Sequence, residues 1–161
     1  MSFDSPETRA ILAFLDRIGI PVALEQVAGE TALPAMTVRD GALVIDPARL
    51  AWPGDILHEA GHIAVTDPAL RATLSDVSSD PAEEMATIAW SYAAALAAGI
   101  DPRLVFHDQG YRGGGGYLAD NFANGSYFGT PMLEYWGMAM PRRDAEAHGP
   151  APYPHMLRWL R

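Results

Sequence analysis

Residues 53–68 read Pro-Gly-Asp-Ile-Leu-His-Glu-Ala-Gly-His-Ile-Ala-Val-Thr-Asp-Pro, and the pattern His-Glu-x-x-His occupies positions 58–62. Apolar residues recur through this stretch at the spacing of one helix face. Pro53 and Gly54 end the segment before it, Asp55 is the expected N-cap, and Pro68 stops the run. We therefore expect a short, mostly apolar helix from about residue 55 to residue 66, around which the domain is built.

The two histidines of this pattern belong to one side of the expected helix. Residues four apart lie one turn apart on the same face, so His58 and His62 can bind a single ion while Glu59 projects beside them. Without a metal, each histidine would need its own hydrogen-bond partner on an otherwise apolar helix. A chance match in a chain of this composition is roughly a one in a hundred event. The pattern therefore indicates a zinc site, and the alternative is a structural protein that carries the pattern by chance.

Gly61 lies in the middle of the pattern. Glycine inside a helix costs about 1 kcal/mol relative to alanine, so its presence needs a reason. Ala60 beside it is also small. This pair indicates that another element packs closely against the helix at this point.

A catalytic zinc site uses three protein ligands and leaves one position open. A third histidine of the extended pattern would fall at position 68, which is Pro68, and Asp67 misses that position by one. The chain has no cysteine, so histidine and carboxylate are the available ligand types. Downstream, Asp80 as N-cap and Pro81 at the first position begin a second helix that runs to about residue 98. Its first turn contains Glu83 and Glu84, the two candidates for the third ligand.

The expected faces of this second helix favour Glu84. Large apolar residues mark the expected core face, and Glu84 falls at its edge, whereas Glu83 points almost the opposite way. Glu83 also follows Asp80 by three residues, where a glutamate closes a capping box on the N-cap amide. The residues that define the expected core face are Met85, Ile88, Tyr92 and Leu96.

His58, Glu59, His62 and a glutamate on the next long helix resemble the gluzincin group of zinc metallopeptidases, whose smallest members are the ImmA/IrrE-like proteins. The resemblance covers roughly residues 38–98. It implies a zinc-dependent hydrolase that cleaves a peptide bond in a peptide or protein substrate. Glu83, with Ala and Thr three and four residues later, is closer to the Glu-x-x-Ala-(Asn/Asp) pattern of some related enzymes, so it stays the alternative ligand.

The fold class that we expect is α+β. A first amphipathic helix runs from Pro6 to about Ile18 and is closed by Gly19, a strand spans residues 21–27, and residues 37–46 form a hairpin that turns at residues 40–41. The resemblance implies a minimal zincin-like domain. In it, a small antiparallel sheet packs on the active-site helix and on the second long helix.

Length and composition fit one compact domain. With 161 residues and 49% apolar residues, the chain can build a single core, which we assign to residues 1–140. Residues 141–161 are a proline-rich tail of the kind that is usually exposed, and its apolar residues Met156, Leu157, Trp159 and Leu160 can dock onto the body or onto another subunit. No long apolar run or basic leader is present, so we expect no membrane span and a cytoplasmic location. A net charge of −9 disfavours nucleic acid and modestly favours cationic peptides.

Residues 103–140 are rich in Gly, Tyr and Phe without a clear period, and we expect the substrate contacts there. His107 and Tyr111 are the candidates for stabilising an oxyanion opposite the zinc, although tyrosines in small domains are mostly core residues. A zinc-binding regulatory or interaction module without peptidase activity is the alternative function. The oligomeric state is not predicted. The other polar residues considered for the oxyanion are Arg112, Tyr117, Tyr127 and Tyr135.

Overall fold

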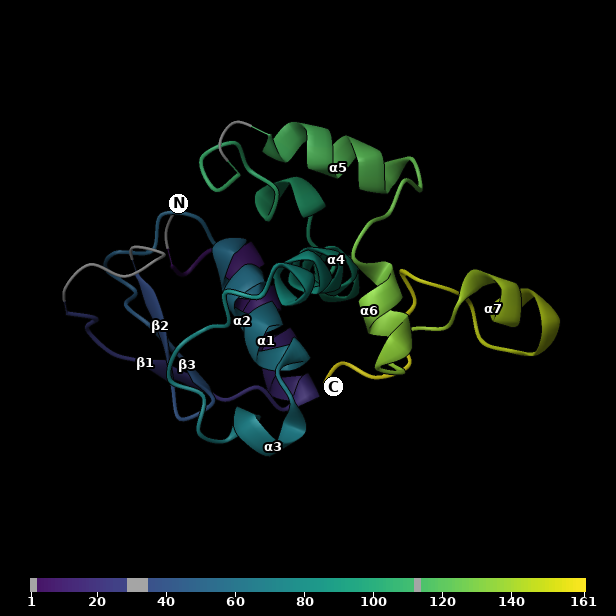
Figure 1. The fold of residues 1–161 in the computed structure, drawn as a ribbon. Coiled ribbons are helices and arrows are strands. Elements are labelled where there is room, and N and C mark those ends of the chain that lie inside the picture. The colour runs from purple at the N-terminus through teal and green to yellow at the C-terminus, as the bar shows by residue number, and fades with distance from the viewer. Residues whose placement is uncertain (1–2, 29–34, 112–113) are drawn as a thin grey trace.

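The structure is a computed structural model that describes residues 3–28, 35–111 and 114–161. It has the expected α+β fold. In Figure 1 the strands lie to the left of α2 and α4 lies to its right, and α2 contacts both. The elements are α1 (Pro6–Ile18), β1 (Val22–Leu24), β2 (Met36–Arg39), β3 (Ala42–Ile45), α2 (Asp55–Val65), α3 (Pro68–Arg71), α4 (Pro81–Ala98), the 3-10 helix η1 (Pro102–Leu104), α5 (Gly115–Ala123), α6 (Thr130–Tyr135) and α7 (Arg142–His148).

Helix α1 confirms the sequence prediction at both ends. The hydroxyl of Ser5 caps the helix by accepting a hydrogen bond from the amide of Thr8. Gly19 ends it in the left-handed conformation with a φ of 83°, which glycine adopts without strain. The apolar face of the helix packs into the core, where Ile11 and Leu15 are fully buried.

The three strands form a mixed sheet in the order β1-β3-β2. The predicted hairpin is confirmed, because β2 and β3 pair antiparallel around Asp40 and Gly41, which both have positive φ. Strand β1, shorter than predicted, pairs parallel with β3, so the sheet is not wholly antiparallel. The run Ala-Leu-Val-Ile of β3 is the most continuously apolar of the three, which suits it to the central position.

Helices α2 and α4 cross closely at Gly61. A β-carbon placed on Gly61 would lie 2.9 Å from Cγ2 of Thr87 and 3.2 Å from the ring of Trp90. The close packing predicted from this glycine is therefore confirmed. Because the two backbones approach here, the first turn of α4 lies beside the middle of α2.

The predicted core face of α4 is wrong in part. Ile88 and Tyr92 are buried, but Met85 and Leu96 are 40% and 45% exposed. From Ala86 to Ala95 every residue of α4 is buried, because α1, α2 and α6 all pack against the helix. Small residues on several sides, rather than one stripe of large ones, define the buried part of this helix.

The last part of the proline-rich segment, from Tyr153 onward, contacts the body. Tyr153 is buried and donates a 2.8 Å hydrogen bond to the carbonyl of Ala89, and Trp90 donates one of 2.9 Å to the carbonyl of Trp159. The ring of Trp159 also meets Phe14 edge-on at 4.8 Å. The expected exposure is therefore wrong at Tyr153, which is buried. Of the two possibilities that the sequence leaves open for the apolar residues near the end of the segment, docking onto the body is the one observed for Trp159.

Within the described ranges, none of the helices combines the length and apolar character needed to span a membrane.

We expect Gly61→Val to destabilise the protein by about 2 kcal/mol or more, because the added methyl groups would force α2 and α4 apart. The matched control is Gly116→Val in α5, where the nearest atom to an added β-carbon is 3.9 Å away. Urea unfolding monitored by tryptophan fluorescence measures both. Equal stability of the two variants would contradict the packing described here.

Candidate metal centre

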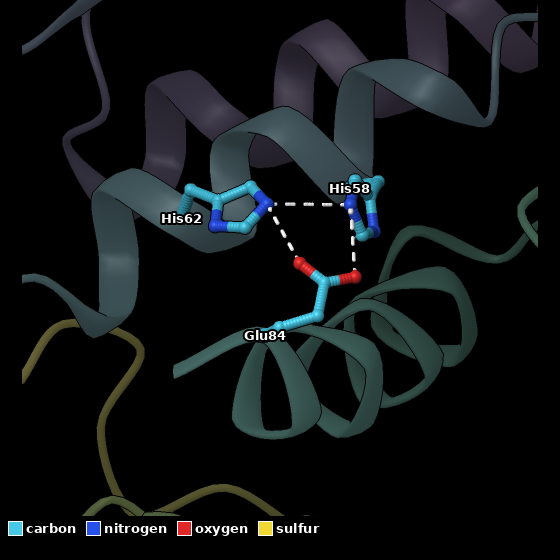
Figure 2. Close-up of side chains that lie close together, drawn as sticks. All are labelled: His58, His62 and Glu84. Carbon is cyan, nitrogen blue, oxygen red and sulfur yellow. Dashed lines mark hydrogen bonds and ion pairs between the residues drawn. The ribbon is translucent and has the colours of Figure 1, made fainter. Parts of the chain in front are cut away.

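Two histidines from α2 and one glutamate from α4 converge on one point. Figure 2 shows the carboxylate of Glu84 directed at the imidazole rings of His58 and His62. The Nε2 atoms of the two histidines are 3.3 Å apart. One carboxylate oxygen of Glu84 lies 3.2 Å from Nε2 of His62, and the other lies 3.7 Å from Nε2 of His58. Of the two glutamates considered, the structure therefore brings Glu84 to the histidines.

These separations fit a divalent metal ion. Ligand atoms about 2.0–2.1 Å from an ion at the centre of a tetrahedron lie about 3.3 Å from one another. The two nitrogens, 3.3 Å apart, and the contact of 3.2 Å between His62 and one oxygen of Glu84 are close to that spacing. The contact of 3.7 Å to His58 involves the other oxygen, and one ligand atom from each of the three residues lies within 4.8 Å of the others. In the described part of the chain, this group of three is the one whose ligand atoms lie close enough together to hold an ion.

Glu83 faces away from this point. Its carboxylate lies 3.7 Å from the guanidinium of Arg161. The predicted capping box is wrong, because the amide of Asp80 donates to the hydroxyl of Ser78 instead, at 3.1 Å. Asp80 itself is the N-cap, as predicted, and accepts a hydrogen bond from the amide of Ala82.

The second nitrogen of each imidazole also has a partner. Nδ1 of His58 lies 3.1 Å from the hydroxyl of Tyr111, and Nδ1 of His62 lies 3.5 Å from the hydroxyl of Thr87. When Nε2 binds a metal, Nδ1 holds the proton and donates it to such a partner, which fixes the tautomer and the ring orientation. Sequence reasoning missed Thr87, although its place three residues after Glu84 puts it on the same helix face.

Glu59 lies in the cavity that contains the three ligands. This cavity has a volume of about 300 Å³, and Glu59 is only 6% exposed. Burial raises the pKa of its carboxyl group, while the nearby His62 acts in the opposite direction. A carboxylate with a raised pKa is a better proton acceptor near neutral pH than an exposed one. The arrangement therefore places a proton acceptor next to the candidate metal position.

His107 contacts the first residue of α2, Asp55, and does not belong to the group of ligands. Its Nε2 is 2.7 Å from the carboxylate of Asp55, its Nδ1 accepts a 3.1 Å hydrogen bond from the amide of Gly110, and its ring stacks on Trp52 at 4.5 Å. Both ring nitrogens are engaged. These contacts hold the segment that leads to Tyr111 against α2.

The prediction that Asp55 is the N-cap of α2 is wrong. Gly54 occupies the N-cap position of α2 without a side-chain hydrogen bond, and Asp55 is the first helical residue. A β-carbon on Gly54 would lie 1.9 Å from the carbonyl oxygen of Leu104, so only glycine fits there. The carboxylate of Asp55 is thus free to pair with His107.

Tyr111 lines the same cavity as the ligands. Burial raises the pKa of its hydroxyl, so the group is protonated near neutral pH. Its role opposite an oxyanion stays a prediction. Among the other polar residues considered for that role, Arg112 lies outside the described residues, and Tyr117, Tyr127 and Tyr135 are exposed and do not line this cavity.

Comparison with known proteins gives no matching family model, no matching curated protein and no matching solved structure. The candidate site therefore rests on the residues and geometry of this chain.

The metal-free site favours the neutral form of His58. Burial, together with the neighbouring His62, lowers the pKa of His58 to about 4, and Glu84 opposes this change. A hydrogen bond from His62 lowers the pKa of Glu84. A neutral imidazole and an ionised carboxylate are the forms that bind a metal, so little deprotonation is needed at neutral pH.

We expect Glu84→Ala to weaken zinc binding by more than about 100-fold. Loss of a residue that only hydrogen-bonds to a ligand typically lowers metal affinity 10- to 100-fold, and this variant loses one of the three ligands itself. The matched control is Glu83→Ala, one residue earlier on the same helix, which should bind zinc like the wild type. Competition with a chromogenic chelator gives both affinities. If Glu83→Ala lost zinc and Glu84→Ala kept it, the assignment of the ligand would be reversed.

The low pKa of His58 predicts a pH-dependent stability of the metal-free protein. Between its value of about 4 in the fold and the ordinary 6.5, the unfolded chain binds more protons at this residue than the folded chain. Stability from this residue is therefore lost as the pH falls through this range, by roughly 3 kcal/mol in total. Urea unfolding in a chelator at about pH 7 and about pH 4.5 should show a smaller loss for His58→Gln than for the wild type. Equal losses of stability in the two proteins would refute the assignment of this pH dependence to His58.

Proposed function

We propose that this protein is a zinc-dependent hydrolase, and that it is a metallopeptidase that cleaves a peptide bond with water. The observation that carries the proposal is the convergence of His58, His62 and Glu84 on one point beside the buried carboxyl group of Glu59. Three ligands from the protein, with a cavity on the open side, are typical of catalytic zinc sites, since structural sites usually have four protein ligands.

Each residue has a distinct task in this proposal. His58, His62 and Glu84 would hold the ion, and zinc bound there would supply Lewis acidity to activate water and polarise a carbonyl group. Glu59 takes a proton from the attacking water and returns it to the leaving amine nitrogen. Tyr111 stays our candidate for stabilising the oxyanion, because it lines the cavity. His107 is the weaker candidate, because both of its ring nitrogens are engaged by Asp55 and Gly110.

The choice of a peptide as substrate rests on two points. The set of His58, Glu59, His62 and Glu84 resembles that of the gluzincin metallopeptidases. The cavity lies between α2, the first turn of α4 and the segment that ends at Tyr111, and it is open to solvent at Glu84, which is 43% exposed. The cytoplasm, expected from the sequence, stays the predicted location.

We expect Glu59→Gln to lower the rate of peptide hydrolysis by at least about 100-fold, because the amide cannot accept the proton from water. Zinc content should be unchanged, since Glu59 is not a ligand in this proposal. The assay measures cleavage of a mixed peptide library by mass spectrometry, with zinc measured on the same samples. Glu83→Gln is the matched control and should keep wild-type activity.

Two results would contradict the proposal in different ways. Full activity of Glu59→Gln would remove this residue from the mechanism. Stoichiometric zinc in the wild-type protein without cleavage of any library member would favour the alternative, a zinc-binding regulatory or interaction module.

A further inference from the structure

A second cavity adjoins the metal cavity. Its volume is about 200 Å³, and it shares Asp55 and Gly110 with the cavity that contains the metal ligands. Its remaining walls include Met36, Leu50 and Trp52. The two cavities are therefore neighbours on either side of the contact between α2 and the segment of residues 107–110.

The polar groups on the shared wall already have partners. Asp55 pairs with Nε2 of His107, and Gly110 donates its amide to Nδ1 of the same ring. Arg49, which also lines the cavity, donates to the carbonyl of Val27. The remaining polar side chain of the lining, Gln109, is exposed. A polar ligand at the other polar groups would have to compete with these bonds, whereas an apolar ligand leaves them intact.

The apolar part of the wall is rigidly placed. Met36 and Leu50 are 3% and 8% exposed, so they belong to the core as well as to the cavity. Trp52 is 36% exposed, and its ring is fixed by stacking on His107 at 4.5 Å. A preformed apolar cavity of this kind favours an apolar occupant because little has to be ordered when it binds.

Building on the proposed function, we propose that this second cavity is a specificity subsite that takes an apolar side chain of leucine or phenylalanine size from the residue next to the cleaved bond. Drug-sized ligands fill cavities of about 300–1,000 Å³, so a smaller cavity suits one side chain. Asp55 and Gly110 line both cavities, so a residue whose carbonyl group lies in the metal cavity has the second cavity beside it for a side chain.

The test uses two zinc-binding probes that differ only in one side chain, the hydroxamates of N-acetyl-leucine and N-acetyl-glycine. We expect the leucine probe to bind the zinc-loaded protein about tenfold to 100-fold more tightly, which is the effect of burying one isobutyl group. The probes are titrated by calorimetry. Peptides with leucine or glycine next to the cleaved bond are also compared, and the quantity measured is the ratio of their kcat/KM values.

Two variants examine the cavity itself. Ala51 lines it and is exposed, so Ala51→Phe can fill the cavity without disturbing the core. Trp52→Ala removes one wall. Both should reduce the preference for leucine to about threefold or less while zinc content stays at the wild-type level. The control is Tyr135→Ala, which removes an aromatic side chain that is 83% exposed and lies outside this cavity.

The outcomes separate this proposal from the proposed function. Equal binding of the two probes by the wild type, or a preference for leucine that survives both variants, would overturn the subsite while leaving hydrolysis intact. A preference that is lost in both variants would support the subsite even if no peptide were cleaved. Failure of both probes to bind the zinc-loaded protein would overturn the subsite, and with it the open coordination position that hydrolysis requires.

Discussion

The close crossing of α2 and α4 at Gly61 is the contact on which the rest of the candidate site depends. Thr87 and Trp90 pack directly over this glycine, so a side chain at position 61 would have to displace them. Glu84 is one turn before Thr87, and this close approach brings its carboxylate within 3.2 Å of His62. A glycine that is unfavourable for the helix is thus retained where it permits a three-ligand site.

The same crossing concentrates polar groups that are costly to bury together. The pKa of His58 is lowered and that of Glu59 is raised, and burial is the largest cause of each change. Both changes indicate that the metal-free site disfavours charge on these groups. A bound cation attracts the carboxylates and uses the lone pairs of the neutral imidazoles, so metal binding and folding stability are expected to be coupled.

Local rules predicted the parts of the fold that depend on neighbours in sequence. The ends of α1, the turn at Asp40 and Gly41 and the N-cap at Asp80 all follow from residues within a few positions of one another. The glutamate that the sequence favours, Glu84, is also the one that the structure brings to the histidines, although two of the residues that defined the expected core face are exposed. What could not be predicted depends on distant partners: Asp55 pairs with His107 instead of capping α2, and Tyr111 reaches His58 from a segment without a recognisable period.

The central claim is that α2 and α4 together hold one metal ion. A crystal structure of the zinc-loaded protein, with anomalous diffraction recorded on both sides of the zinc absorption edge, tests it most directly. The account predicts one zinc peak at about 2.0–2.2 Å from Nε2 of His58, from Nε2 of His62 and from a carboxylate oxygen of Glu84. A zinc peak bound by other residues, or imidazole rings turned away from each other with no ion between them, would contradict it.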